Sequence, residues 1–84
     1  KVFLAKGFIS TPMISMGTLR MKCDLGIVIT ASHNPASYNG FKLKGPHGGP
    51  LFPMYVEEIE KLIPESSSVN SEKISPEEFQ NKKL

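Results

Sequence analysis

The chain has 84 residues and a mass of 9.3 kDa, which corresponds to one small domain or to part of a larger one. Its formal charge of +2, from ten basic and eight acidic side chains, gives no support to nucleic-acid binding. A single cysteine, Cys23, excludes an internal disulfide and fits a reducing, cytoplasmic location, and no apolar run approaches the roughly 20 residues that span a bilayer.

The first 30 residues predict a strand, a helix and a second strand. Val2–Ala5 is a short apolar run typical of a buried strand. Thr11 and Pro12 form a helix-start signal, and Gly26 is the expected C-terminal cap. Four residues spaced as one helical face are expected in the core: Met13, Met16, Leu19 and Cys23. With a buried strand at Gly26–Thr30, these elements predict a βαβ unit with parallel strands, and thus an α/β fold.

The middle of the chain predicts a loop, a short strand and another helix. Ala31–Gly40 is a loop by composition, and Phe41–Lys44 alternates apolar and basic residues as an edge strand does. Residues 45–50, GPHGGP, exclude regular structure, and a helix then runs from Pro53 until Pro64 stops it. The apolar side of that helix comprises Tyr55, Val56, Ile59, Leu62 and Ile63.

The C-terminal part predicts a linker and one more short helix. Ser66–Ser71 has the composition of a flexible linker. Ser75 and Glu78 have the spacing of a capping box, in which each side chain bonds to the backbone N–H of the other residue.

Charge is distributed unevenly along the chain. Residues 1–52 carry a net charge of +5, and residues 53–84 carry −3. A basic, glycine-containing first part favours an anionic small molecule such as a phosphate ester. The simpler interpretation is that these lysines only keep the surface soluble.

The loop after the second predicted strand carries candidate chemistry. Ser32 and His33 follow the carboxyl end of the strand, the edge at which open α/β sheets bind ligands. Lys42 lies on the next strand, where its ammonium or a protonated His33 would stabilise a phosphorylated serine. Composition alone leaves the plain alternatives open, namely a turn serine, a loop histidine and a solvated lysine. Neither the G-x-S-x-G nucleophile elbow nor a Walker A loop is present.

The segment ITASHNPASYNGFKLKGPHGGP, residues 29–50, resembles the active-site loop of the α-D-phosphohexomutases, the phosphoglucomutase and phosphomannomutase superfamily. T-A-S-H-N-P followed by Y-N-G-x-K is a highly specific pattern. The resemblance extends to STP at residues 10–12, which looks like a helix start of that family, and covers about residues 1–64.

This resemblance implies a phosphoserine enzyme. Ser32 would donate its phosphoryl group to a hexose phosphate and recover one from the resulting hexose 1,6-bisphosphate, so that hexose 1-phosphate and hexose 6-phosphate interconvert. Lys42 falls where the family has its proposed general acid/base, and His33 matches the histidine after the serine. Family members use Mg²⁺, held by an oxygen of the phosphoserine and by carboxylates of a D-G-D-x-D loop in another domain.

The resemblance also implies the organisation of the chain. Residues 1–64 would be part of the family's first domain, a three-layer arrangement with a mixed sheet and flanking helices, and residues 65–84 a linker and short helix. The only aspartate is Asp24, so the carboxylates for Mg²⁺ are missing. The start at Lys1 also suggests an excised piece, so we expect the chain to be inactive alone, to need the rest of a longer mutase, and to self-associate.

Two other interpretations remain open from the residues. The chain fits a non-catalytic α/β module that uses the loop as an anion-binding or assembly surface. It also fits an enzyme in which His33, rather than Ser32, accepts the phosphoryl group.

Overall fold

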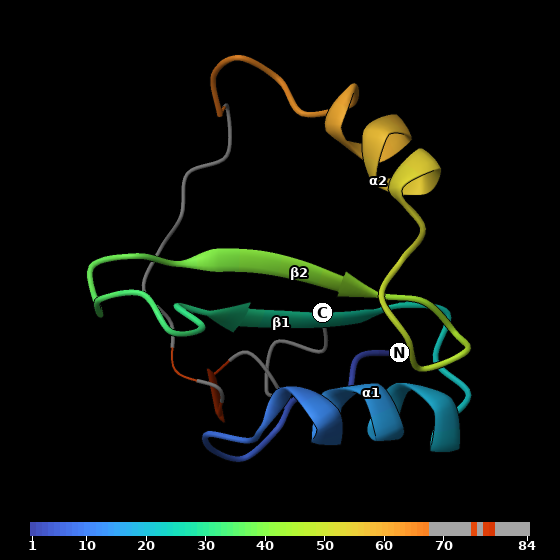
Figure 1. Cartoon of the computed structure of the whole chain (residues 1–84). Coiled ribbons are helices and arrows are strands. Elements are labelled where there is room, and N and C mark those ends of the chain that lie inside the picture. Colours follow the sequence, from blue (N-terminus) through green and yellow to red (C-terminus); the bar gives the residue numbers. More distant parts are fainter. Residues whose placement is uncertain (68–74, 76, 79–84) are drawn as a thin grey trace.

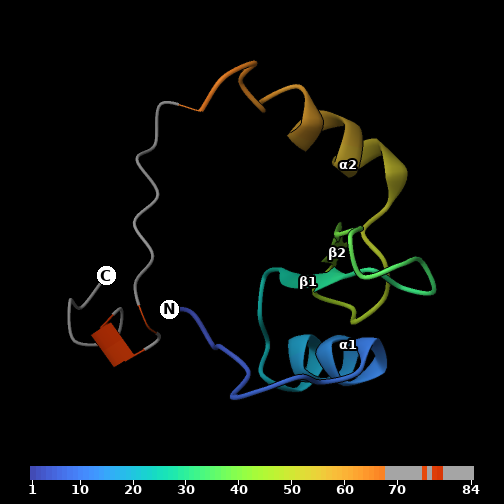
Figure 2. The ribbon, with the colours of Figure 1, turned by 90° about the vertical axis from the view of Figure 1, so that its left-hand side faces the viewer.

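The computed structural model describes residues 1–67, 75, 77 and 78. Its elements are helix α1 (Thr11–Arg20), strand β1 (Gly26–Thr30), strand β2 (Gly40–Lys44) and helix α2 (Pro53–Glu60). The two strands form one sheet, with α1 on one side of it and α2 on the other (Figures 1 and 2). This is a small α/β arrangement of three layers, so the predicted α/β class is confirmed.

The sheet is antiparallel, with Val28 opposite Lys42 and Gly26 opposite Lys44. Residues opposite each other in such a ladder point to the same face. The face toward α1 therefore carries Gly26, Val28, Lys42 and Lys44. Val28, at 8% exposure, is the one buried apolar side chain among the described residues.

The strand predicted at Val2–Ala5 is wrong, and with it the parallel βαβ unit. The first ten residues form no helix or strand, and Val2 and Leu4 are 78% and 71% exposed. A strand is stable only when a neighbouring strand completes its hydrogen bonds. Within the described residues, β1 and β2 are the only strands and the one isolated bridge pairs Lys44 with Pro50, so this segment has no partner.

Helix α1 begins where the proline signal predicted but packs through another face. Its inward residues are spaced i, i+3, i+4 and i+7, and they are Thr11, Ile14, Ser15 and Thr18. Thr18 is 4% exposed and donates its hydroxyl to the carbonyl of Ile14 at 2.8 Å. Thr18 packs against Gly26, where a Cβ atom would overlap its hydroxyl. The core expected from Met13, Met16 and Leu19 is wrong, because these side chains are 52–58% exposed.

Helix α1 also ends earlier than predicted. Lys22 takes the left-handed conformation at φ 52°, and the amide of Cys23 donates to the carbonyl of Thr18 at 2.9 Å. The amide of Lys22 donates to the carbonyl of Leu19 at 3.2 Å, which completes a Schellman motif. Gly26, the cap expected from sequence, is instead the first residue of β1.

Helix α2 starts at Pro53 as predicted but ends at Glu60, before Pro64. None of its residues is buried, and Val56 alone is partly covered. Its C-terminal end carries an ion pair between Lys61 and Glu58 at 2.9 Å. The expected apolar side therefore contributes little packing.

Few features of the predicted tail fall within the described residues. The capping box is confirmed, since the Ser75 amide donates to Glu78 Oε2 at 2.9 Å and the Glu78 amide donates to Ser75 Oγ at 3.2 Å. Most of the linker predicted at Ser66–Ser71 lies outside the described residues, as does most of the last helix.

Candidate active site

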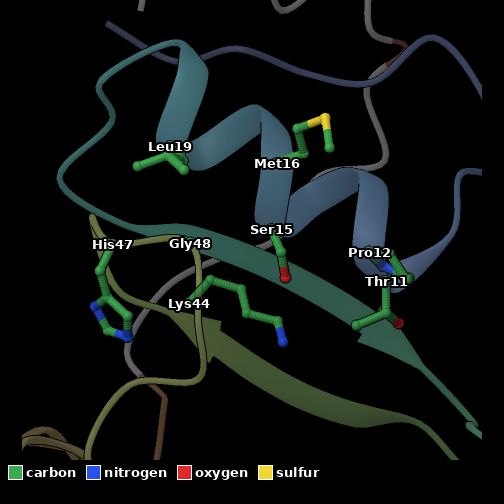
Figure 3. Close-up of a pocket in the computed structure, with 8 residues that line it drawn as sticks. All are labelled: Thr11, Pro12, Ser15, Met16, Leu19, Lys44, His47 and Gly48. Atoms are coloured by element: carbon green, nitrogen blue, oxygen red, sulfur yellow. The ribbon is translucent and has the colours of Figure 1, made fainter.

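The TASHNP loop lies at the carboxyl end of β1, where the chain turns back into β2. The first turn of α1 lies at the same end of the sheet (Figures 1 and 3). A helix N-terminus carries a partial positive charge. The fold therefore places the loop at the sheet edge predicted from sequence, on the positive side of α1.

The backbone of the loop holds Ser32 in an uncommon conformation. Its φ is 54°, in the left-handed region that non-glycine residues rarely occupy. The amide of Ser32 donates to Thr30 Oγ1 at 2.9 Å, and the amide of Asn34 donates to the carbonyl of Ala31 at 2.9 Å. These two bonds fix the turn on either side of the serine, so Ser32 is presented to solvent by a constrained backbone.

Ser32 and His33 are in direct contact. The Oγ of Ser32 lies 3.2 Å from Nδ1 of His33, and both side chains are exposed. When Nδ1 is unprotonated it accepts the hydroxyl proton, and when protonated it donates to the serine oxygen. The pair is therefore suited to proton transfer at a serine oxygen that is open to a substrate.

Lys42 lies on β2 two residues after Gly40, and it is exposed. Among the described residues no hydrogen bond or ion pair joins it to Ser32 or His33. The structure thus brings together the first two predicted site residues but not the third. Lys42 lies on the α1 side of the sheet, with an amine that has no hydrogen-bond or ion-pair partner in that part of the chain.

Sequence reasoning did not single out Thr30 or His47. Thr30 stands two residues before Ser32, and at this spacing a threonine hydroxyl can bond to the backbone and close a turn. The sequence therefore contained a signal for this contact. The ring of His47 stacks on Phe52, with centroids 5.3 Å apart and planes 11° apart. That contact joins the 45–50 loop to the start of α2, and no local pattern indicates it.

No cluster of metal-binding side chains occurs in the part of the chain that the structure describes. It contains no set of three or more His, Cys, Asp or Glu side chains that would hold an ion. The residues present therefore do not form a Mg²⁺ site by themselves. Among the described helices none has the length and apolarity to cross a membrane.

Comparison with known proteins supports the family that the TASHNP loop resembles. The family model described as phosphoglucomutase/phosphomannomutase, alpha/beta/alpha domain I, matches residues 1–70. The chain belongs to this family. The superfamily predicted from the loop is thus confirmed, and the three layers of α1, sheet and α2 agree with the alpha/beta/alpha description of its first domain.

Several curated relatives of this phosphohexomutase chain are phosphoglucosamine mutases. That of Azorhizobium caulinodans is 48% identical over 65 residues, which are 77% of this chain and 14% of the relative. Those of Xanthobacter autotrophicus and Roseobacter denitrificans are each 48% identical, over 74% and 71% of this chain and 14% and 13% of the relatives. The chain therefore spans about one-seventh of the length of these relatives.

Proposed function

We propose that this chain supplies the phosphoserine loop of a phosphohexomutase, which interconverts hexose 1-phosphate and hexose 6-phosphate through hexose 1,6-bisphosphate. The observation that carries the proposal is the contact between Ser32 Oγ and His33 Nδ1 at 3.2 Å, on a constrained turn at the end of β1. Membership of the phosphohexomutase family supports it. Activity would belong to the whole protein, with the 84 residues alone inactive.

In the first half-reaction a sugar hydroxyl oxygen attacks the phosphorus of phosphorylated Ser32. The bond between phosphorus and Ser32 Oγ breaks as the new phosphorus–oxygen bond forms. Unprotonated Lys42 takes the hydroxyl proton, and protonated His33 gives a proton from Nδ1 to Ser32 Oγ. The products are a free serine and the hexose bisphosphate.

The second half-reaction reverses these roles on the other phosphate of the turned intermediate. His33 takes the proton of Ser32 as its oxygen attacks phosphorus, and Lys42 returns a proton to the leaving sugar oxygen. Both residues recover their starting protonation, so the cycle balances. Because Lys42 has no partner among the described residues, its amine is available to a substrate.

Mg²⁺, when bound in the whole protein, would neutralise charge on the phosphoryl oxygens. This chain would offer it one ligand, an oxygen of phosphorylated Ser32, and all other ligands would come from outside the described residues. The substrate is proposed to be glucosamine phosphate, because the relatives quoted above are phosphoglucosamine mutases.

The test is mass spectrometry of the whole protein after trypsin digestion. The tryptic peptide Cys23–Lys42 contains the entire loop. We expect a phosphoryl group on Ser32 that is lost on addition of excess glucosamine 6-phosphate with Mg²⁺. A Ser32 that stays unmodified after incubation with a hexose bisphosphate would refute the mutase proposal and leave the non-catalytic anion-binding module.

Two variants in that peptide sharpen the result. Ser32→Ala is expected to lower mutase activity by about 10³-fold or more, since it removes the group that carries the phosphoryl. Ser37→Ala changes an exposed serine of the same loop and should retain the label and the activity. A label that survives Ser32→Ala and is released by acid would instead identify His33 as the acceptor.

A further inference from the structure

A pocket with a mainly apolar lining lies between α1 and β2, apart from the Ser32 loop. It has a volume of about 440 Å³ and is lined by Thr11, Pro12, Ser15, Met16, Leu19, Lys44, His47 and Gly48 (Figure 3). No acidic side chain is in this lining. The proposed mutase reaction uses none of these residues.

Lys44 is the unusual member of the pocket. It is only 8% exposed, whereas lysines are seldom buried unless they are paired. Within the described residues its ammonium makes no hydrogen bond or ion pair. Every completely enclosed side-chain nitrogen in that part of the chain has a hydrogen-bond partner, so the Lys44 ammonium is not completely enclosed. The ammonium therefore keeps its remaining contact with solvent through the pocket, into which Figure 3 shows it pointing.

Two hydroxyl groups of α1 face the same space. Figure 3 shows the Ser15 hydroxyl directed toward the end of Lys44, with Thr11 one helical turn nearer the N-terminus. Neither hydroxyl forms a hydrogen bond among the described residues. One cation at the end of a mostly buried side chain and two unpaired hydroxyls thus converge on one pocket.

The first turn of α1 adds a positive field but few free amides. The amides of Met13 and Ile14 already donate to the carbonyl of Ser10, at 3.0 and 3.2 Å. Any ligand must therefore be bound mainly by side chains, with the helix dipole adding to the attraction.

The 45–50 loop closes the pocket against α1. Gly48 has φ 83°, and a Cβ there would come within 2.8 Å of the Ser15 carbonyl oxygen. The loop thus approaches the helix as closely as glycine allows. This contact holds the wall of the pocket next to Ser15, so the cavity is a built part of the fold.

We propose that this pocket binds a phosphate group, as inorganic phosphate or as the phosphate of a small ester. The Lys44 ammonium opens into the pocket without a counter-charge, and an anion supplies that charge. A tetrahedral phosphate also has enough acceptor oxygens to bond Lys44, Ser15 and Thr11 together. The site is separate from Ser32 and does not depend on the mutase proposal.

The test is an amide NMR titration of the whole protein with inorganic phosphate, in a Ser32→Ala background that keeps the catalytic loop unphosphorylated. Saturable shifts are expected at Ser15 and Gly48. Lys44→Met should weaken binding by about tenfold or more, since charge-assisted hydrogen bonds are the strong ones. Lys6→Met, which removes an exposed lysine outside the pocket, should leave the affinity unchanged.

A second titration, with glucosamine 6-phosphate, distinguishes inorganic phosphate from a phosphate ester as the ligand of the pocket. The compound that binds with the lower Kd is the ligand for which the pocket is suited. Absent shifts, shifts confined to residues 32–34, or a Lys44→Met variant that binds normally would each overturn the proposal. If Lys44→Met fails to fold, Lys44→Arg and Ser15→Ala replace it, with binding retained in the first and weakened in the second. Phosphorylation of Ser32 is measured separately, in the whole protein without the Ser32→Ala substitution, so either proposal can fail alone.

Discussion

At the scale of single residues, the proposed phosphoryl transfer would depend on how the backbone holds Ser32. A left-handed serine costs on the order of 1–3 kcal/mol and persists only where neighbours impose it. Here Thr30 imposes it through its hydroxyl, which accepts the Ser32 amide at 2.9 Å. We therefore propose that Thr30 is a positioning residue that acts through Ser32.

Thr30→Val tests that role, because it removes the hydroxyl and nearly preserves the shape. Loss of one hydrogen bond is worth about 1 kcal/mol, so we expect roughly a fivefold lower rate of Ser32 phosphorylation in the whole protein. Thr30→Ser should restore the rate, since it restores the acceptor. A purely structural role would instead lower the stability of both variants and leave their kcat unchanged when folded.

At the scale of elements, small residues determine how α1 meets the rest of the chain. Gly26 admits Thr18 on one side, and Gly48 admits the carbonyl of Ser15 on the other. The helix is consequently held by close backbone contacts rather than by its methionines, and a single added methyl group should disturb them.

Gly48→Ala is expected to destabilise the protein by about 1–3 kcal/mol, because alanine is strained at φ 83° and its Cβ meets backbone that cannot easily move. Gly17→Ala is the matched control. No atom lies within 4 Å of the added group, and alanine favours the helix by about 1 kcal/mol. Urea unfolding of both variants measures the difference, and equal stabilities would contradict the proposed contact.

At the scale of the whole molecule, most large apolar side chains among the described residues are exposed. The sheet face away from α1 carries Ile27, Ile29 and Phe41, which are 49%, 66% and 66% exposed. Ile29 and Phe41 are cross-strand partners, so they form a continuous apolar surface. A surface of this kind favours association.

The isolated chain is therefore expected to self-associate in a concentration-dependent way, as measured by light scattering. Ile29→Lys combined with Phe41→Lys should shift it toward the monomer, because two charges would have to be desolvated in the contact. Leu62→Lys, at an 81% exposed site away from the sheet, serves as the control. A wild-type chain that is monomeric at all concentrations would contradict this prediction.

Local signals in the sequence determined the elements and the loop. Helix α1 begins at Thr11 with Pro12 in its first turn, and α2 begins at Pro53, because proline fits only the first helical turn. Branched residues mark β1. The TASHNP pattern identified the family, since its specificity resides in side-chain order alone, and the role of Ser32 stays a prediction. Each of these features depends on residues a few positions apart, which a sequence displays directly.

Only the tertiary structure decided what each element packs against. A strand at Val2–Ala5 needs a neighbour that the described residues do not provide, and α1 turned Thr18 inward because Gly26 left room for it. The burial of Lys44 follows from the antiparallel register, which sets it opposite Gly26 and beneath α1. These outcomes depend on contacts between distant segments, and burial and pairing have no signature in the local pattern.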